Sequence, residues 1–356
     1  MSPRSPAVAF ALCAALFVSP ALAQAHRPSI HRLDPPPISA GMSDADLSAA
    51  LDPWLVELTQ REAFSGVVLL ARDGEAVFAR AYGMADRERG VANQVDTRFN
   101  IASIGKALTQ VAVMQLVTEG RISMTTTLGE VLPDYPNEAA RAATVEQLLN
   151  HRGGVSDFFG PQFERAAKSE FVSNAAYFRF VSQLPQQFAP GEREQYCNGC
   201  YVVLGEMIAR VSGMSYEDYI ARNVYARAGM TGSGFFPRDP LPVNAARPYG
   251  QPVGEGTPIV EVSDMHGLAG SAAGGSYATA HDLLALDNAM RTHRLYGEPG
   301  PRANMEGGIA GGAPGVNTVM ESSGNWTIIV LANRSPPTAM AVVQSVFPLL
   351  TGAGPS

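Results

Sequence analysis

Lysine is scarce in this chain of 356 residues. Lys106 and Lys168 are its only lysines among 26 basic residues, so arginine supplies nearly every other cation. Basic runs and arginine–aromatic stripes are absent and the net charge is −7, which argues against nucleic acid as a partner. Hydrophobic residues make up 46% and charged residues 17%, a balance typical of a globular enzyme and not of a disordered chain.

A long apolar run is also missing. The run AVAFALCAALFV near the N-terminus is too short to cross a bilayer comfortably. It follows the basic residue Arg4 and precedes the sequence ALA at 21–23, whose two alanines fit a cleavage site, and this is the order of a signal peptide. We predict a signal peptide at 1–25, cleaved after Ala23 or Ala25, and an exported protein, periplasmic or secreted, with no stable membrane insertion afterwards. A buried N-terminal helix is the alternative.

The remaining chain divides into three patterns. Residues 26–42 are rich in proline and predict a disordered lead-in before a folded domain at 43–352. Short strands and a hairpin signal, Asp73-Gly74, appear early, and further strands return near the C-terminus. The middle is mostly helical. This order predicts an α+β fold, in which one antiparallel sheet built from both chain ends is flanked by helices and carries an inserted helical subdomain.

The expected elements follow these patterns. Helical periodicity with start and stop signals predicts helices at 44–64, 103–119, 144–154, 201–213, 215–230, 279–293 and 337–350. Alternating or apolar runs predict strands at 65–72, 75–83, 315–322 and 325–334. The sheet region is therefore expected at about 43–100 and 305–352, and the helical region at about 101–290.

The scarce lysine Lys106 lies three residues after Ser103, at the predicted start of a helix. Positions i and i+3 share one face of a helix, so the hydroxyl and the amine can meet there. A serine hydroxyl needs a base to become a nucleophile. Lysine can lose its proton when it is partly desolvated, whereas arginine cannot. The pair is therefore a candidate nucleophile with its activating group, although Ser-x-x-Lys alone is a weak motif.

Tyr196 and Asn198 lie two residues apart, just before the helix predicted at 201–213. An ammonium group lowers the pKa of a nearby phenol, which can then act as a general base. An asparagine amide can bridge a lysine and a substrate carbonyl. The alternative is a tyrosine packed at a helix entrance and an asparagine cap.

Several blocks together resemble the serine β-lactamase-like superfamily: FNIASIGKALT, VEQLLNHRGGVSDF, FAPGEREQYCNGCYVVLGEMIARVSG, AAGGSYATAHDLL and GGAPGVNTVM. The resemblance extends over about 43–350 and is nearest to class C β-lactamases, D-Ala-D-Ala carboxypeptidases and esterases of that fold. It implies Ser103 as the acylated nucleophile, Lys106 as its partner, Tyr196 as the general base and Asn198 as the group that orients substrate. It implies a small-molecule or peptide substrate and neither metal nor organic cofactor.

The third motif of the superfamily departs from its usual form. Lys-Thr-Gly or His-x-Gly is expected, but the matching positions hold Ile309, Ala310 and Gly311. The side chain expected to engage a substrate carboxylate is lost, so the sequence favours esters or amides that lack this carboxylate; alternatively, Ile309 lines an acyl pocket. By resemblance, the backbone N–H groups of Ser103 and Gly312 would form the oxyanion hole.

A second departure is the shortened segment at 285–308, where the superfamily carries another helix and strand. Both departures leave two functions open. One is a serine hydrolase whose class, esterase, peptidase or β-lactamase, the sequence does not resolve. The other is a non-catalytic penicillin-binding-like relative that binds a peptide or cell-wall fragment without turnover. Oligomeric state is not indicated.

Two further features beside the motifs are structural candidates. His151 is expected at a helix end, where a cation would favour the helix dipole. Cys197 and Cys200 bracket Asn198, and no further ligands cluster with them to hold zinc. In an exported protein they form either a small disulfide or two partly buried thiols, and the sequence leaves both open.

Overall fold

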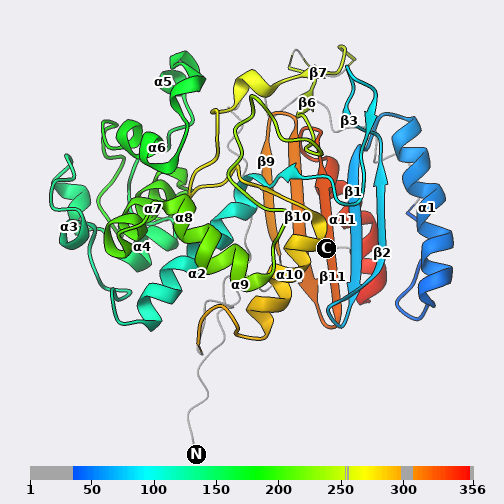
Figure 1. Ribbon diagram of the computed structural model, residues 1–356, viewed down its shortest axis with the longest axis horizontal. Coiled ribbons are helices and arrows are strands. Elements are labelled where there is room, and N and C mark those ends of the chain that lie inside the picture. Colours follow the sequence, from blue (N-terminus) through cyan, green and yellow to red (C-terminus); the bar gives the residue numbers. More distant parts are fainter. Residues whose placement is uncertain (1–34, 253, 255, 298–307, 353–356) are drawn as a thin grey trace, which may run out of the picture.

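The computed structural model describes residues 35–252, 254, 256–297 and 308–352 (Figure 1). The predicted signal peptide and most of the lead-in lie outside these residues. Within the lead-in, Ile38 is only 7% exposed and packs with residues of the first helix. The packed chain therefore begins before residue 43, where the sequence placed the start of the domain.

A five-stranded antiparallel sheet forms the centre of the larger lobe, with the strand order β2-β1-β11-β10-β9. Its strands are β1 (Gly66–Arg72), β2 (Glu75–Tyr82), β9 (Ile309–Ala313), β10 (Val316–Ser323) and β11 (Trp326–Ala332). The two early strands and the three late strands meet at the β1–β11 pair. The prediction of one antiparallel sheet built from both chain ends is confirmed.

Both faces of this sheet are buried. Along β1, Val68 and Leu70 face a core shared with α1 (Asp44–Gln60) and α11 (Thr338–Thr351). The alternate residues Val67 and Leu69 face a larger core, which includes α2 (Gly105–Thr118) and α10 (Ala280–Arg291). This period of two explains why β1 reads as a continuous apolar run. Figure 1 shows α1 and α11 on one side of the sheet and the helical region on the other.

The helical region is assembled around α7 (Asn198–Ser212), which packs against α2, α4 and α6. The other helices here are α3 (Leu128–Val131), α4 (Val145–Leu149), α5 (Pro161–Arg165), α6 (Asn174–Val181), α8 (Tyr216–Ile220) and α9 (Ala226–Ala228). A π-helical turn joins α8 to α9 without interruption. The region also contains short strands that the sequence did not reveal: β6 (Tyr249–Gly250), β7 (Val260–Glu261) and β8 (Tyr277–Ala278), the last paired with β5 (Phe99–Asn100). Two further short strands, β3 (Met84–Asp86) and β4 (Val91–Ala92), pair beside β2.

The segment at 285–308, which is shorter than in the superfamily, lies partly within the described residues. The described residues between α10 and β9, 292–297, form neither helix nor strand, and 298–307 lie outside the described residues. Strand β9 pairs directly with β10 through a tight turn at Pro314-Gly315. Strand β9, which holds the third-motif positions, is thus the edge of the sheet, and the described residues of 292–297 supply no further strand beside it.

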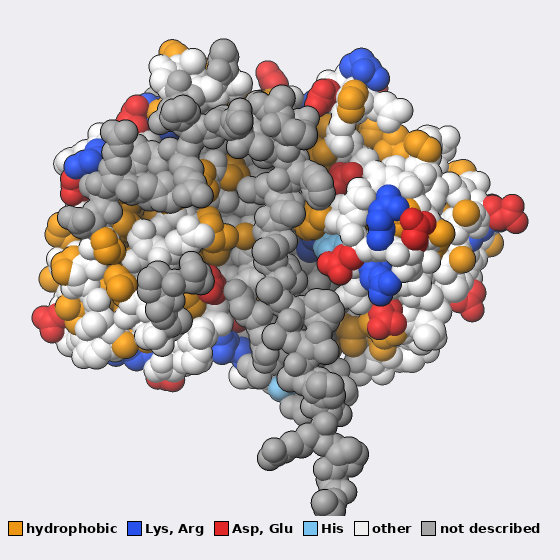
Figure 2. Space-filling view, turned by 180° about the vertical axis from the view of Figure 1, so that it is seen from behind, with side chains coloured by type: hydrophobic (Ala, Val, Ile, Leu, Met, Phe, Trp, Pro, Cys, Tyr) orange, Lys and Arg blue, Asp and Glu red, His pale blue; other side chains and the backbone are white. Residues whose placement is uncertain are grey.

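Among the described residues, no helix is long and apolar enough to span a bilayer. On the face shown in Figure 2, basic and acidic side chains are interspersed over the helical lobe rather than gathered into a basic patch.

Candidate active site

Ser103 lies in a tight turn of 3₁₀ helix, Ala102–Ile104, immediately before α2. The sequence predicted a helix from this serine, and the structure adds the turn. Ala102 has a φ of +43°, a conformation that non-glycine residues rarely adopt. Its N–H donates to Oδ1 of Asn100 at 2.9 Å, which holds the strained residue in place. The backbone is therefore held in an unusual conformation directly before the Ser103 hydroxyl.

Lys106 lies one turn later and is only 6% exposed. Its Nζ donates to Asn198 Oδ1 at 2.6 Å and to the backbone oxygen of Ala273 at 2.7 Å. The third hydrogen-bonding direction of Nζ points to Ser103 Oγ, which is 3.2 Å away. Because the first two partners are acceptors only, they fix the amine so that its last proton, or its lone pair, points at the serine.

Tyr196 approaches the same hydroxyl from the segment directly before α7. Its phenolic oxygen and Ser103 Oγ share a hydrogen bond of 2.7 Å, across a sequence separation of 93 residues. Lys106 Nζ lies 4.8 Å from the centre of the Tyr196 ring. The structure therefore brings together the three groups that the sequence proposed as nucleophile, partner and base.

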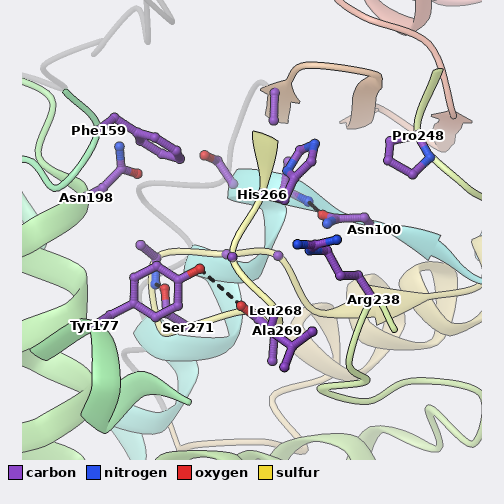
Figure 3. A pocket seen from close by; sticks show the side chains of 18 of the residues that line it. Asn100, Phe159, Tyr177, Asn198, Arg238, Pro248, His266, Leu268, Ala269 and Ser271 are labelled. Carbon is purple, nitrogen blue, oxygen red and sulfur yellow. Dashed lines mark hydrogen bonds between the residues drawn. The ribbon is translucent and has the colours of Figure 1, made fainter. Parts of the chain in front are cut away.

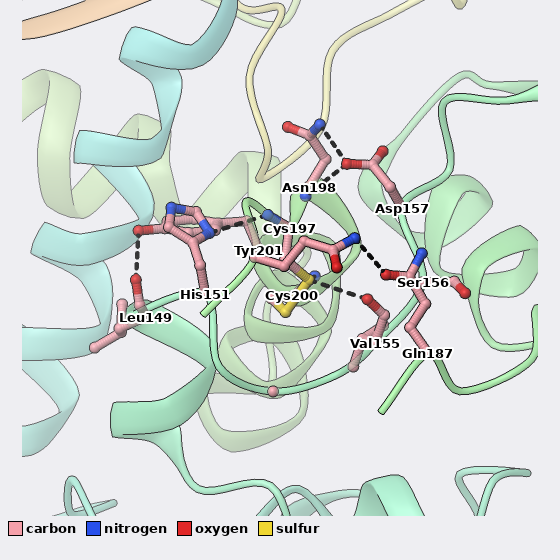
Figure 4. The surroundings of a disulfide bond; sticks show 12 residues. Leu149, His151, Val155, Ser156, Asp157, Gln187, Cys197, Asn198, Cys200 and Tyr201 are labelled. Atoms are coloured by element: carbon pink, nitrogen blue, oxygen red, sulfur yellow. Dashed lines mark hydrogen bonds between the residues drawn. A yellow bond between two sulfur atoms is a disulfide. The ribbon is translucent and has the colours of Figure 1, made fainter. Parts of the chain in front are cut away.

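Asn198 is the first residue of α7, and its orientation is set by a residue that the sequence reasoning did not single out. Asp157 Oδ2 accepts from Asn198 Nδ2 at 2.8 Å and from the Asn198 backbone N–H at 3.2 Å (Figure 4). The amide nitrogen is thereby turned toward the carboxylate, and the amide oxygen toward Lys106. The carboxylate fixes which end of the amide meets the amine.

Strand β9 forms the sheet side of the site. A Cβ atom added at Gly311 would lie 2.7 Å from the backbone nitrogen of Ser103, so only glycine allows this approach. The next residue, Gly312, pairs with Asn317 beside the turn-flanking pair Ala313 and Val316. Hydrogen-bonded and non-hydrogen-bonded pairs alternate in an antiparallel ladder, and the turn-flanking pair is hydrogen-bonded. The N–H of Gly312 therefore points away from β10, on the side where the cleft lies.

Ile309 does not line the described cleft. It is partly buried and packs against the larger core, on the same face of β9 as Gly311. The acyl-pocket alternative raised by the sequence receives no support from this position. The backbone of β9 is retained beside Ser103, while the third-motif cation is replaced by an aliphatic packing group.

An open cleft of about 770 Å³ lies between the lobes, with Ser103 and Gly312 in its wall. Its helical side is aromatic, with Phe158, Phe159 and Phe163 among the lining residues. Figure 3 shows Phe159 and Asn198 on one side and Arg238 and His266 on the other. A substrate carbonyl placed at Ser103 would therefore lie between an apolar wall and a wall that carries a cation.

The contacts of His151 are those of a structural residue, as predicted. The predicted reason, a positive charge at a helix end, is wrong. Burial and the nearby Lys106 charge lower the pKa of His151 from 6.5 to about 4, so it is neutral at pH 7 and does not act as a cation at a helix end. Its Nδ1 accepts from the Cys197 N–H at 3.2 Å, and its ring lies 4.7 Å from that of Tyr196. The histidine packs beneath the tyrosine and ties it to the start of α7.

Stability is expected to fall as the pH drops from 6.5 to 4, because the unfolded chain then binds a proton at His151 that the folded chain does not. The contribution of this residue is about 3 kcal/mol at most. Urea unfolding of wild type and His151→Gln at pH 7 and pH 4.5 measures it. The variant should lose less stability on acidification than wild type, whereas the exposed control His281→Gln should behave as wild type. Equal losses in all three proteins would contradict the assignment.

Cys197 and Cys200 form a disulfide, which resolves the alternative that the sequence left open (Figure 4). The Cys197 sulfur accepts from the Cys200 N–H at 2.9 Å and so caps α7. The bridge closes the first turn of α7, which contains Asn198 and directly follows Tyr196. The described residues include no cluster of three or more His, Cys, Asp or Glu side chains that could hold a metal ion.

The comparison with known proteins agrees with this geometry. A family model described as Beta-lactamase matches residues 51–347. The chain belongs to the beta-lactamase family. The resemblance to the serine β-lactamase-like superfamily is confirmed, and the fold is that of penicillin-binding-like proteins.

Individual relatives differ in what they are named for. Esterase EstB of Burkholderia gladioli is 27% identical over 289 residues, which is 72% of this chain and 73% of the esterase. PbpX of Bacillus subtilis (strain 168), named as a penicillin-binding protein, is 28% identical over 239 residues; the match covers 66% of this chain but only 57% of that relative. The structure of a penicillin-binding protein from Bacillus halodurans superimposes with a TM-score of 0.73 at 26% identity, covering 83% of this chain and 99% of that one.

Proposed function

We propose that this chain is an exported serine hydrolase that acts through an acyl-enzyme on an ester, amide or β-lactam carbonyl. The observation that carries the proposal is the convergence on one hydroxyl: Ser103 Oγ lies 2.7 Å from the Tyr196 oxygen and 3.2 Å from Lys106 Nζ. The esterase among its relatives supports hydrolysis as the reaction type. No cofactor is needed for such chemistry.

The proposed reaction has two stages. The Lys106 amine first takes the proton of the Tyr196 phenol. Ser103 Oγ then attacks the carbonyl carbon while its proton passes to the Tyr196 phenolate, whose charge the Lys106 ammonium has stabilised. The carbonyl oxygen becomes an oxyanion that the N–H groups of Ser103 and Gly312 stabilise. The tetrahedral intermediate then collapses, the bond to the leaving group breaks, and the leaving group takes the proton from Tyr196. Water attacks the acyl-serine in the same way and releases the acid.

Asn198 and Asp157 are proposed to act before the chemistry. Asp157 turns the amide oxygen of Asn198 toward Lys106, and the amide accepts one of the N–H groups of the amine. This restricts the amine to an orientation in which it also meets Ser103. Asp157 is therefore a positioning residue, since its carboxylate accepts hydrogen bonds from Asn198 and from the Phe159 N–H and none from the nucleophile.

A second candidate function is a binding protein that does not turn over its ligand. It is favoured by Ile309, which packs into the core at the position where the superfamily carries a cation or hydrogen-bonding group. Such a protein would bind a peptide or cell-wall fragment in the cleft.

Covalent labelling separates the two candidates. Purified wild type and Ser103→Ala are incubated with a fluorescent fluorophosphonate and a fluorescent penicillin, and hydrolysis of 4-nitrophenyl butyrate is followed in parallel. The hydrolase predicts a label on wild type that Ser103→Ala lacks, together with ester turnover. Folded wild type that takes neither label and releases no nitrophenol would instead identify the binding protein.

Asp157→Asn is expected to reduce kcat for 4-nitrophenyl butyrate by about tenfold, because the variant can present an N–H group to the Asn198 amide and disturb its orientation. KM should change little, since Asp157 does not line the described cleft. The exposed control Asp134→Asn should retain wild-type kinetics. An unchanged kcat in folded Asp157→Asn would show that Asn198 is oriented without the carboxylate.

A further inference from the structure

Arg238 lines the cleft on the side opposite Phe159 (Figure 3). It lies on the connection between α9 and β6, and its backbone N–H donates to the Leu268 oxygen at 2.7 Å, which anchors the residue to the glycine-rich loop behind the cleft. Its position thus depends on backbone contacts and not on its own side chain.

Arg238 is the only permanently charged side chain among the described residues that line the cleft. These described lining residues include no Asp or Glu. The lining also includes His266, which is neutral at pH 7 because burial lowers the pKa of its ring. The His266 Nε2 donates to the Pro314 oxygen at 2.7 Å. A ligand in the cleft therefore meets one positive charge, and the carboxylate already paired with that charge, Asp264, is not among the described lining residues.

The present bonds of this guanidinium leave capacity for a ligand. Its ion pair joins Nη1 to Asp264 Oδ1 at 3.1 Å, and that aspartate side chain is 97% exposed. Exposed ion pairs contribute little and exchange readily with solvent. The Nε–H group of Arg238 is buried without a hydrogen-bond partner among the described residues, a costly state for a donor. A carboxylate can bind the terminal nitrogens of the guanidinium in fork geometry, and a shift of the side chain toward the cleft would bring the buried Nε into the same contact.

We propose that Arg238 binds a carboxylate of the substrate and gives the cleft a preference for anionic acyl compounds. The inference deepens the proposed hydrolase function and rests on it. The missing third-motif cation led the sequence analysis to favour substrates without a carboxylate. Arg238 supplies a cation from a different element, about 70 residues earlier in the chain than Ile309, so the loss at Ile309 does not leave the cleft uncharged.

Matched esters test the preference. Mono-4-nitrophenyl glutarate and 4-nitrophenyl pentanoate differ by a carboxylate in the acyl part, and 3-acetoxybenzoate and its methyl ester differ by one in the leaving group. Arg238→Gln should reduce kcat/KM for the anionic member of at least one pair by about tenfold or more, mainly through KM, and change the neutral member by less than about threefold. Arg238→Lys should retain part of the preference, and the exposed control Arg222→Gln all of it.

A second variant acts in the opposite direction. Asp264→Asn removes the competing carboxylate, so KM for the preferred anionic ester should fall by about twofold to fivefold while its neutral partner is unaffected. If Arg238→Gln changes both members of each pair equally, or if Asp264→Asn leaves both KM values unchanged, Arg238 does not bind a substrate carboxylate.

Binding without turnover separates this inference from the proposed function. In the Ser103→Ala background, calorimetry with mono-4-nitrophenyl glutarate and 3-acetoxybenzoate should show binding that Arg238→Gln weakens. Loss of ester turnover in wild type, with Arg238-dependent binding intact, would overturn the hydrolase and leave the anion site. Turnover that persists with no dependence on Arg238 would overturn the anion site alone.

Discussion

Lys106→Arg is expected to lower kcat/KM for 4-nitrophenyl butyrate by about 10³-fold or more, although it preserves the positive charge. The amine is buried and held by Asn198 and Ala273 at 2.6 and 2.7 Å, so its remaining position meets Ser103. A guanidinium cannot give up its proton, and its planar fork does not reproduce three tetrahedral directions. Charge alone therefore does not replace the lysine.

The second lysine of the chain provides a matched control. Lys168 Nζ donates to the backbone oxygens of Phe163, Glu164 and Ala166 near the end of α5, where it supplies positive charge and takes no part in the proposed proton transfer. Lys168→Arg should retain activity within about twofold. Lys106→Met should be as inactive as Lys106→Arg, because both lack an amine. More than about a tenth of wild-type activity in folded Lys106→Arg would show that proton transfer does not involve this amine.

The difference between these two lysines illustrates what a sequence can predict about the site. Ser103 and Lys106 lie on one helical turn, so their contact follows from local geometry. The approach of Tyr196 spans 93 residues and was expected only through the resemblance to a known superfamily. Apolar runs likewise predicted β1 and β11, which face a core on both sides, and alternating runs predicted β2 and β10.

Other parts of the site depend on contacts that no local pattern reveals. Strand β9 has the sequence IAGGA, which lacks the alternation and β-branched residues of a typical strand. The roles of Asp157 and Arg238 depend on other segments of the chain. Asp157 binds Asn198, and Arg238 lines the cleft together with residues of other segments. The strained φ of Ala102 results from the surrounding backbone and not from its own residue type. Tertiary structure alone assigns these features.

Gly311→Ala is expected to reduce kcat for 4-nitrophenyl butyrate by about 10²-fold. The added methyl group would lie 2.7 Å from Ser103 N, 2.8 Å from Ala102 Cβ and 2.8 Å from the Ile101 oxygen. Two of these atoms belong to the backbone, so β9 must move away from the nucleophile turn. This movement separates the two N–H donors of the proposed oxyanion hole, whose spacing decides how well they stabilise the intermediate.

The control for this substitution is Gly41→Ala, where an added Cβ meets no atom within 4 Å. It should leave kcat and the melting temperature unchanged. Because Gly311→Ala acts on the position of β9 and not on the proton-transfer groups, its pH–rate profile should keep the wild-type shape at a lower rate. Labelling by a fluorophosphonate should slow in proportion to kcat, since its phosphoryl oxygen uses the same donors. A folded Gly311→Ala enzyme with wild-type kcat would show that β9 can shift without consequence, and that the N–H of Gly312 does not stabilise the oxyanion.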